Sequence, residues 1–397
     1  MHFRAIAIAL FAFGAAVGAP VACSPQVVDA VDPVPETGGA STTGGSAGMT
    51  GGSAGAGATG GTGVACPDGG SEADRDGDSV PDCLDACPED AEKTAGQGLC
   101  GCGIPDSFED GSPTCARLVE LLAHRYAFNG TGIAVVDTAA EDSPAEGNAD
   151  GEVVNAELSG QGTLPLDGFA SEQYAGLPNR ILSTLPGSVT LEAWLTWAGG
   201  GPNWQRIFDF GDNDGPREGE QGPSGTSYLF LTPRTPLDPA PGEFPPQNQK
   251  LRVGYKRPGA GEWEVMLDAD IALPSGVETH VALVIDGTLK QMSLYVDGEP
   301  RSAIAHFRNV GAPAYTSMLG AYDWSAPVPT ADGGTVMPPA IDLSVINDIN
   351  NWLGRSQFIG DAELQATYNE FRIYSGALTP ELIAISKLGG PNAVFLQ

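Results

Sequence analysis

The sequence predicts an all-β fold for its longest part, a mostly antiparallel β-sandwich over residues 116–397. Short alternating or β-branched runs are separated there by Gly, Pro, Asp and Asn, the pattern of strands and turns. Two dipeptides at strand ends, Asp286-Gly287 and Asp297-Gly298, favour tight hairpin turns. Only one segment carries clear helix signals, so strands must supply the core.

The runs place the strands in order along the chain. We expect them near residues 124–129, 151–158, 189–197, 206–210, 228–231, 251–255, 263–267, 280–286, 292–296, 352–356 and 367–374. Residues 280–297 then form one hairpin. Thr379 is an N-cap and Pro380 a first-turn residue, which predicts a helix over the apolar run that follows. Three Gly/Pro-rich stretches, at 212–225, 232–248 and 324–350, are either functional loops or disordered insertions.

Residues 1–22 have the composition of an export signal. Arg4 precedes an apolar run that is too short and too weakly flanked for a stop-transfer helix. The run ends Ala19-Pro20-Val21-Ala22-Cys23, which resembles a bacterial lipoprotein cleavage box, although Pro20 stands where that box usually has Leu. The resemblance implies that Cys23 carries lipid. Either the protein is lipid-anchored at the bacterial cell surface, on the outer membrane, or it is secreted.

Two further units lie between this signal and the sandwich. Residues 23–65 are Gly, Ser, Thr, Ala and Pro with almost no large apolar side chain, which predicts a flexible linker. Residues 66–115 are poor in hydrophobic residues, so disulfides and a metal must replace a core. Removing Cys23 from the seven cysteines leaves an even set for disulfide bonds in an oxidising compartment: Cys66, Cys83, Cys87, Cys100, Cys102 and Cys115. Their pairing is open, but the close spacing of Cys100 and Cys102 favours different partners.

The sequence is strongly acidic. It has 50 acidic and 19 basic residues and a formal net charge of −31. Binding to a phosphate backbone needs a basic surface, so we expect no nucleic-acid partner. Acidic surfaces suit divalent cations or keep a protein soluble. No segment is long and apolar enough to span a bilayer, so membrane contact is expected through the N-terminal lipid alone.

The loop from Asp74 to Asp85 has carboxylates at relative positions 1, 3, 5, 9 and 12. This is the spacing of a calcium loop, in which alternating Asp side chains converge on one cation that takes about six to eight oxygens. The candidate Ca²⁺ ligands are Asp74, Asp76, Asp78, Asp82 and Asp85. The alternative is an acidic, hydrated spacer without an ordered ion.

With Ala86-Cys87-Pro88 after it and Cys100-Gly101-Cys102-Gly103 beyond, this loop resembles a thrombospondin type 3 calcium repeat. The ligands that the resemblance implies are the side chains of Asp74, Asp76, Asp78 and Asp85, the backbone carbonyl of Val80, and Asp82 either directly or through water. Ser79 stands where Gly usually makes the sharp turn, which implies a strained loop or a lowered affinity.

Several motifs in the predicted sandwich resemble the laminin G-like, concanavalin A-type jelly-roll domains of bacterial surface proteins. They are Leu191-Glu192-Ala193-Trp194, Gln205-Arg206-Ile207-Phe208-Asp209-Phe210, Thr279-His280-Val281-Ala282, Leu294-Tyr295-Val296-Asp297-Gly298, Asn351-Trp352-Leu353-Gly354-Arg355-Ser356-Gln357-Phe358 and Glu370-Phe371-Arg372-Ile373-Tyr374. The resemblance covers nearly the whole span 124–388. It implies an antiparallel jelly roll with a lectin-like function, the binding of a glycan or of an extracellular protein.

The sequence does not predict an enzyme. Sugar-cleaving relatives of this jelly roll resemble the laminarinases, which carry Glu-x-Asp-x-x-Glu on one strand, and this triplet does not occur here. Retaining hydrolysis needs two carboxylates about 5–5.5 Å apart, whereas the predicted strands hold isolated acids such as Glu192 and Glu370. The His and Cys residues show no pattern of a nucleophile with a base.

Sugar binding by aromatic faces with a few fixed polar groups fits the sequence better. In the run 189–197 one strand face is apolar, and Trp194 lies on the other face with Glu192. Trp194 is therefore a platform for a sugar, unless the second face is also covered and Trp194 belongs to the core. Trp204 and Trp324, within or beside predicted loops, are alternative platforms.

Together these features predict a cell-surface lipoprotein with a calcium-binding stalk and a non-catalytic, lectin-like domain. The expected ligand is a glycan or another extracellular molecule. The alternative is a structural or adhesive surface protein that binds another protein. A glycoside hydrolase is the third possibility.

Overall fold

The computed structural model describes residues 73–94, 98, 100–109, 112–139, 149–168, 171–236, 249–259, 263–309, 315–393 and 396. All of them belong to one compact unit, Val64–Gln397. The predicted signal peptide, Cys23, the linker and Cys66 lie outside the described residues.

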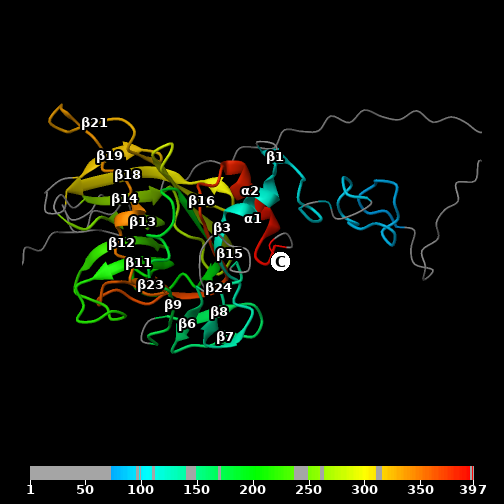
Figure 1. Cartoon of the computed structure of the whole chain (residues 1–397), viewed down its shortest axis with the longest axis horizontal. Helices are drawn as coiled ribbons and strands as arrows, with labels where there is room; N and C mark the ends of the chain where they lie inside the picture. Colours follow the sequence, from blue (N-terminus) through cyan, green and yellow to red (C-terminus); the bar gives the residue numbers. More distant parts are fainter. Residues whose placement is uncertain are drawn as a thin grey trace, which may run out of the picture. The chain divides into compact units, whose positions relative to one another are not determined.

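Two antiparallel sheets form the β-sandwich, and the all-β jelly roll expected from the sequence is confirmed. The larger sheet has ten strands in the order β19-β18-β14-β13-β12-β11-β23-β9-β6-β5, most of which Figure 1 shows side by side. Their bounds are Thr316–Leu319 (β19), Ser302–Asn309 (β18), Trp263–Ala269 (β14), Arg252–Lys256 (β13), Gly225–Thr232 (β12), Phe208–Asn213 (β11), Asn350–Leu353 (β23), Tyr174–Leu177 (β9), Gly151–Val154 (β6) and Ala134–Val135 (β5).

The second sheet has eight strands. Its main path is β17-β16-β15-β10-β24-β3, with β20 paired to β16 and β8 paired to β24. The bounds are Glu299–Pro300 (β17), Gln291–Val296 (β16), Glu278–Asp286 (β15), Val189–Trp197 (β10), Gln365–Tyr374 (β24), Leu122–Tyr126 (β3), Tyr322–Asp323 (β20) and Leu164–Asp167 (β8).

The remaining elements are short. They are β1 (Phe108–Glu109), β2 (Ser112–Pro113), β4 (Thr131–Gly132), β7 (Leu158–Ser159), β21 (Val328–Pro329), β22 (Thr335–Val336), the 3₁₀ turn η1 (Leu343–Val345), and the helices α1 (Thr114–Leu121) and α2 (Pro380–Gly389). Neither described helix has the length and apolar character that a membrane crossing requires.

The main core lies between the two sheets. Alternate residues of β10, Leu191, Ala193 and Leu195, are buried there with Phe208 and Phe210 of β11, which belongs to the other sheet. A strand points successive side chains to opposite faces, so each strand contributes every second residue to this core. Complete burial of each large apolar side chain among them, such as Leu191 or Phe208, stabilises the fold by about 1.5–3 kcal/mol.

The sequence predicted the central strands closely. Strand β10 has the expected bounds, and β15 and β16 form the expected hairpin. Asp297 and Gly298 both have positive φ, 53° and 84°, as the tight turn from β16 to β17 requires. Helix α2 starts after Thr379, whose side chain accepts a hydrogen bond from the backbone nitrogen of Leu382.

The outer face of the eight-stranded sheet is covered. A second apolar cluster joins residues of β15, β16 and β24 to both helices and to the Cys-rich segment, and Figure 1 shows α1 and α2 next to this sheet. The cluster contains Cys100, Ile104, Cys115, Leu118, Leu122, Ala282, Val284, Tyr295, Tyr374, Leu378, Leu382, Ile383 and Ile385. Apolar packing therefore continues across residue 115, the predicted boundary between the Cys-rich unit and the sandwich.

The covered face, here called the closed face, also buries a charge network. Glu370 of β24 accepts hydrogen bonds from Arg125 Nε (2.9 Å), Arg372 Nε (2.5 Å) and the backbone nitrogen of Asn392 (2.6 Å). Glu192 of β10 accepts one from the hydroxyl of Ser386 on α2 (2.6 Å). These carboxylates are inaccessible, and both face guanidinium groups in the interior.

Trp194 belongs to this closed face, which corrects its assignment as a sugar platform. Its side chain is 3 % exposed, its ring centroid lies 4.4 Å from that of His280, and Arg372 Cζ is 4.1 Å from the ring centroid. Trp324 is also wrong as an open platform, because it is 6 % exposed and packs on Tyr322 within the main core. Both rings have protein on the faces that a sugar would need.

Candidate functional site

The outer face of the ten-stranded sheet carries a line of paired residues that cross its strands. In register from β23 to β18 they are Trp352, Asp209, Phe230, Gly254, Met266 and His306. Leu229 and Leu231 point into the main core, so their neighbours Tyr228 and Phe230 point outward. Aromatic and charged side chains are therefore brought together on a face that the two helices do not cover.

A pocket of about 180 Å³ opens on this face. Its lining comes from the segment before β11, from β12 and β14, and from the loop after β23: Trp204, Arg206, Tyr228, Phe230, Glu264, Met266, Phe358 and Asp361. Trp204 and Phe358 are half-buried and form its more accessible apolar walls, while Tyr228, Phe230 and Met266 are buried. The pocket is thus mainly apolar, with a few fixed polar groups, as small-molecule sites usually are.

Gly254 of β13 makes room for one ring of the pocket. A Cβ atom at this position would lie 2.3 Å from the Phe230 ring, far inside van der Waals contact. Phe230 therefore lies directly over the backbone of the next strand, and Arg206 Cζ stands 4.1 Å from its ring centroid. Tyr228 packs beside it, with ring centroids 5.4 Å from Phe230 and 5.8 Å from Phe358.

Glu264 of β14 forms one polar end of the pocket. It accepts hydrogen bonds from the hydroxyls of Tyr228 (3.0 Å) and Tyr315 (2.7 Å) and from Arg308 Nη2 (3.0 Å). Burial and the Glu264 charge raise the pKa of both tyrosines well above its ordinary value. Both hydroxyls therefore stay protonated near neutral pH and act as donors to the carboxylate.

Arg206 forms the other polar end. Its guanidinium donates from Nη2 to Asp361 Oδ2 (2.7 Å), from Nε to Asp209 Oδ2 (3.1 Å) and from Nη1 to the backbone oxygen of Trp204 (2.6 Å). Asp361 Oδ2 also accepts from the hydroxyl of Ser356 (2.7 Å). The arginine is therefore held in one orientation between two carboxylates.

Asp209 lies beneath this arginine and is completely buried. Its Oδ2 accepts the backbone N–H of Gln357 (3.0 Å), whereas its Oδ1 is buried and has no hydrogen-bond partner. Burial raises the pKa of Asp209 to about 7, against the opposing effect of Arg206. The charge that balances Arg206 therefore changes with pH near neutrality.

The structure places Trp204, one of the three predicted aromatic residues, in this pocket. Tyr228, Phe230, Glu264, Met266 and Asp361 were not singled out from the sequence. One sequence pattern could have indicated this pocket. The run 228–231 has aromatic residues at both positions of one strand face and leucines on the other. A strand that is apolar on both faces needs either a cover or a ligand on the second face.

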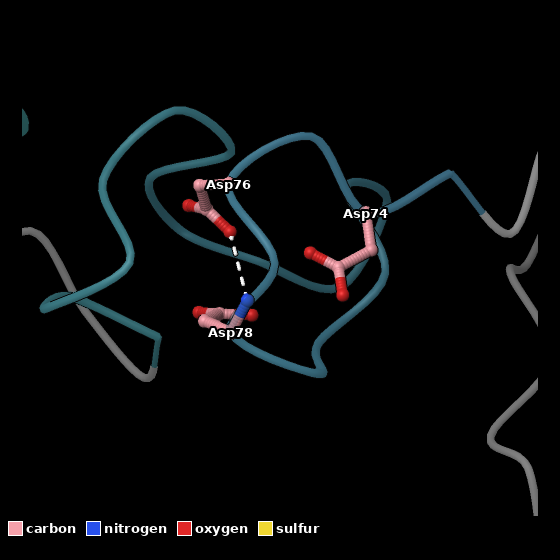
Figure 2. A group of neighbouring side chains, drawn as sticks. All are labelled: Asp74, Asp76 and Asp78. Carbon is pink, nitrogen blue, oxygen red and sulfur yellow. Dashed lines mark hydrogen bonds between the residues drawn. The ribbon is translucent and has the colours of Figure 1, made fainter. Parts of the chain in front are cut away.

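A separate group of carboxylates lies in the Cys-rich segment. Ligand oxygens of Asp74, Asp76 and Asp78 come within 4.8 Å of one another, and Figure 2 shows Asp74 pointing across the loop toward the other two. Asp74 also accepts the backbone N–H groups of Gly77 (2.7 Å) and Ser79 (3.1 Å). The loop is therefore organised around its own carboxylates, and this cluster can hold a metal ion.

The two other predicted carboxylate ligands, Asp82 and Asp85, lie outside this group of three. Asp82 is bonded to Arg75 instead, through the backbone nitrogen (2.9 Å) and Nε (3.2 Å). Its role as a direct or water-mediated ligand stays a prediction, because a cation would have to compete with Arg75 for this carboxylate. Asp85 Oδ1 accepts a hydrogen bond from the backbone nitrogen of Cys87 (2.8 Å). The backbone nitrogen of Val80 donates one to Asp78 Oδ1 (2.7 Å).

The chemistry of this loop fits a cation. Asp76, Asp78 and Asp85 each have a buried Oδ2 atom without a hydrogen-bond partner. Loss of solvent, together with the neighbouring charges of Asp78, Asp85 and Asp74, raises the pKa of Asp76. Ser79 has φ of +78°, the left-handed conformation that glycine adopts most easily, so the strain expected at this position is present.

Two disulfide bonds fix the chain after this loop, Cys87–Cys102 and Cys100–Cys115. Cys100 and Cys102 therefore have different partners, as predicted. Cys83 is also disulfide-bonded. The second bridge belongs to the apolar cluster of the closed face, so it joins the Cys-rich segment to the sandwich.

A family model described as the concanavalin A-like lectin/glucanases superfamily matches residues 169–334. This segment includes six of the eight residues that line the pocket, all except Phe358 and Asp361. The chain is thus similar over this segment to a family of lectins and glucanases with the jelly-roll fold. No curated protein matches the chain.

The chain is also similar, at low identity, to several solved structures. Domain 4 of an extracellular GH43 arabinanase from Geobacillus stearothermophilus, in complex with arabinotriose, is 15 % identical, with a TM-score of 0.37 over 66 % of this chain and 96 % of that domain. The Ruminococcus gnavus IT-sialidase CBM40 bound to α2,3-sialyllactose is 16 % identical, with a TM-score of 0.36 over 56 % and 95 %.

Trypanosoma rangeli sialidase, in complex with 2,3-difluoro-KDN, is 17 % identical. The TM-score is 0.42 over 72 % of this chain, which spans 35 % of the sialidase.

Proposed function

We propose that the protein binds a glycan, without cleaving it, in the pocket on the outer face of the ten-stranded sheet. The observation that carries this proposal is the pocket itself, with half-buried Trp204 and Phe358 as walls and fixed polar groups at both ends. A sugar ring has apolar C–H faces and a rim of hydroxyls, so it needs this combination of aromatic contact and hydrogen bonding. The match of residues 169–334 to a lectin and glucanase family supports it.

The acids of the pocket favour binding over hydrolysis. Glu264 is bonded to Arg308 and Tyr315, and Asp361 is bonded to Arg206 and Ser356. A general acid in a glycosidase must reach the leaving-group oxygen, and a second carboxylate must lie across the sugar from it. Here each carboxylate that lines the pocket is hydrogen-bonded to a guanidinium of the protein, Glu264 to Arg308 and Asp361 to Arg206.

The test is a glycan-binding screen on the full chain and on Trp204→Ala. We expect the variant to bind about 5- to 150-fold more weakly, corresponding to about 1–3 kcal/mol of stacking, with an unchanged melting temperature. Tyr174→Ala is a matched control, because Tyr174 is also a half-buried aromatic residue of this sheet, where it packs on Trp352, but it does not line the pocket. An equal loss of glycan affinity in both variants would contradict the proposal. Turnover of any polysaccharide by the pure protein would contradict it as well.

If no glycan binds in this screen, the second candidate function is favoured, that of a surface protein that binds another protein. In that case the pocket walls would still form the contact, because aromatic residues dominate protein interfaces as well. A pull-down with an extracellular matrix extract, compared between the wild type and Trp204→Ala, separates the two functions.

We also propose that the Asp-rich loop binds Ca²⁺. Asp74, Asp76 and Asp78 would hold the ion, and Asp85 would add an oxygen through its unpartnered Oδ2. An oxygen-only donor set suits a hard cation such as Ca²⁺, which would neutralise the clustered charges. Calorimetry on the full chain should show Ca²⁺ binding that Asp76→Ala removes and Asp270→Ala retains, since Asp270 lies on the surface after β14. Retained binding in Asp76→Ala would exclude this loop.

We propose in addition that the protein is exported and anchored by lipid at Cys23, with plain secretion as the alternative. The disulfide bonds support an oxidising location. Mass analysis of the mature protein and membrane fractionation of Cys23→Ala test the anchor. A mature protein without acyl groups would favour secretion.

A further inference from the structure

Building on the proposed glycan-binding function, we propose that the ligand is an uncharged sugar and that one sugar ring enters the pocket. Three properties of the pocket favour such a ligand: its free hydrogen-bonding groups, the charge around them and its volume.

The polar atoms left for a ligand are mainly acceptors. Asp361 uses Oδ2 for Arg206 and Ser356, while its Oδ1 accepts no hydrogen bond from the residues that the structure describes. Glu264 Oε1 accepts one hydrogen bond, from Tyr228, and retains a second lone-pair direction. Carboxylate oxygens accept hydrogen bonds from hydroxyls, so both ends of the pocket favour a ligand that donates O–H groups.

The one cation among the residues that line the pocket is already paired. Arg206 gives Nε, Nη1 and Nη2 hydrogen bonds to three protein oxygens, two of them on carboxylates. Recognition of a sugar carboxylate or sulfate normally uses an arginine fork, which needs two parallel N–H groups directed at the ligand. This arginine instead directs one N–H group each of Nε and Nη2 toward Asp209 and Asp361, so the fork is used within the protein.

An anionic sugar would also meet unfavourable charge. Glu264 and Asp361 stand at the two ends of the pocket, and the whole chain carries a formal charge of −31. Like charges in a partly desolvated pocket repel more strongly than in water, because the effective dielectric constant is lower. Neutral glycans avoid this repulsion and still satisfy the acceptors.

The cavity has room for one ring. Its volume is about 180 Å³, whereas a cavity of about 150 Å³ is known to hold benzene. A six-membered sugar ring therefore fills the pocket, and further units of a glycan lie outside it. This size predicts recognition of a terminal or branching unit.

The experiment is a screen of the full chain against matched glycan pairs that differ by one acidic group, at neutral pH and physiological salt. Examples are lactose with 3′-sialyllactose, and α-1,4-galactotriose with α-1,4-trigalacturonic acid. Any neutral member that binds should bind at least tenfold more tightly than its acidic counterpart. Tighter binding of acidic members would overturn this inference and leave glycan binding intact. Binding to no glycan at all would overturn both.

Asp361→Asn sharpens the test, because it keeps the shape of the side chain but removes a charge and releases Arg206. We expect its discrimination against acidic glycans to fall several-fold, measured below the melting temperature, which should itself decrease because Arg206 is buried. Asp270→Asn is the control, since it removes the same charge beside Arg301 outside the pocket. Unchanged discrimination in Asp361→Asn, or an equal change in Asp270→Asn, would contradict the charge argument.

Ligands of different length test whether the pocket holds a single ring. For the best neutral ligand, the free monosaccharide and the trisaccharide should bind within about threefold of each other. If the affinity rises more than tenfold from the monosaccharide to the trisaccharide, the site is an extended groove and the single-ring inference is wrong.

Discussion

The outer faces of the two sheets have similar residue types, but one face is covered by other segments and the other carries an open pocket. On the eight-stranded sheet, Glu192, Trp194 and Glu370 lie beneath α1, α2 and the disulfide-linked segment. On the ten-stranded sheet, aromatic and acidic residues line an open pocket. Both faces have an arginine stacked on an aromatic ring, Arg372 on Trp194 and Arg206 on Phe230. Exposure therefore depends on what packs over a strand, and the residue types of the strand alone do not determine it.

The two faces also treat buried carboxylates differently. Burial raises the pKa of Glu370, but Arg372 and Arg125 outweigh it and hold the net pKa below its ordinary value. Asp209 has Arg206 alone, which is shared with Asp361, and its pKa is raised to about 7. Two guanidinium groups thus outweigh burial at Glu370, whereas the one shared guanidinium does not outweigh it at Asp209.

The largest expected effect is on the closed face. Trp194→Ala should lower the free energy of unfolding by about 3–5 kcal/mol, because it removes a buried ring from a packed site. Glycan binding by the folded fraction should be unchanged. Chemical denaturation and calorimetry check the two parts. A variant with normal stability and no binding would place Trp194 on an open face instead.

The next effect is a pH dependence set by Asp209. Its pKa is raised in the folded protein, so the native state binds more protons than the unfolded chain between pH 4 and about 7. Stability from this group is present at low pH and is lost as pH rises through that window, by about 1.4 kcal/mol per pH unit. Asp209→Asn mimics the protonated form and should flatten this slope. Equal slopes in wild type and variant would show that Asp209 stays ionised.

A smaller effect is expected from Gly254→Ala on the open face. The added methyl group overlaps the Phe230 ring, so the variant should lose about 1–3 kcal/mol of stability and bind glycan weakly. Gly176→Ala is a control in β9, because a Cβ there meets its nearest neighbours at 3.8 Å. Similar melting temperatures for both variants would show that Phe230 can move without cost.

The smallest effect is expected from Thr379→Ala, which removes the N-cap of α2. The loss should be about 1 kcal/mol, with faster hydrogen exchange in α2 and on the closed face. Glycan affinity should not change, because α2 contributes nothing to the pocket lining. Weaker glycan binding in this variant would show that the two faces are coupled.

The central strands could be predicted because their hydrophobic alternation is strong and their turns have Asp-Gly dipeptides. Strand β18 was missed, since Ala303 and Ala305 give a weak apolar pattern beside His306. Helix α1 was also missed. It has eight residues and no acidic residue in its first turn, and a helix this short depends on packing and on the disulfide bond of Cys115.

The candidate site was less predictable. Arg206 and Asp361 are 155 residues apart, and no local pattern shows that they meet. The carboxylate cluster of the Asp-rich loop was predictable in its first half, because Asp74, Asp76 and Asp78 are close neighbours in one turn. Asp82 could not be placed from spacing, since its contact with Arg75 depends on how the loop turns back.

The pairing of β3 with β24 has a consequence for synthesis. Arg125 finds its partner Glu370 245 positions later, and β24 also lies between β10 and β3 in the sheet. A nascent chain that has not reached residue 365 therefore has β10 without one neighbour and β3 without its partner strand. Such long-range pairing slows folding. The sandwich must stay incomplete until β24 has left the ribosome, so deletion of β24 should be far more damaging than its ten residues suggest.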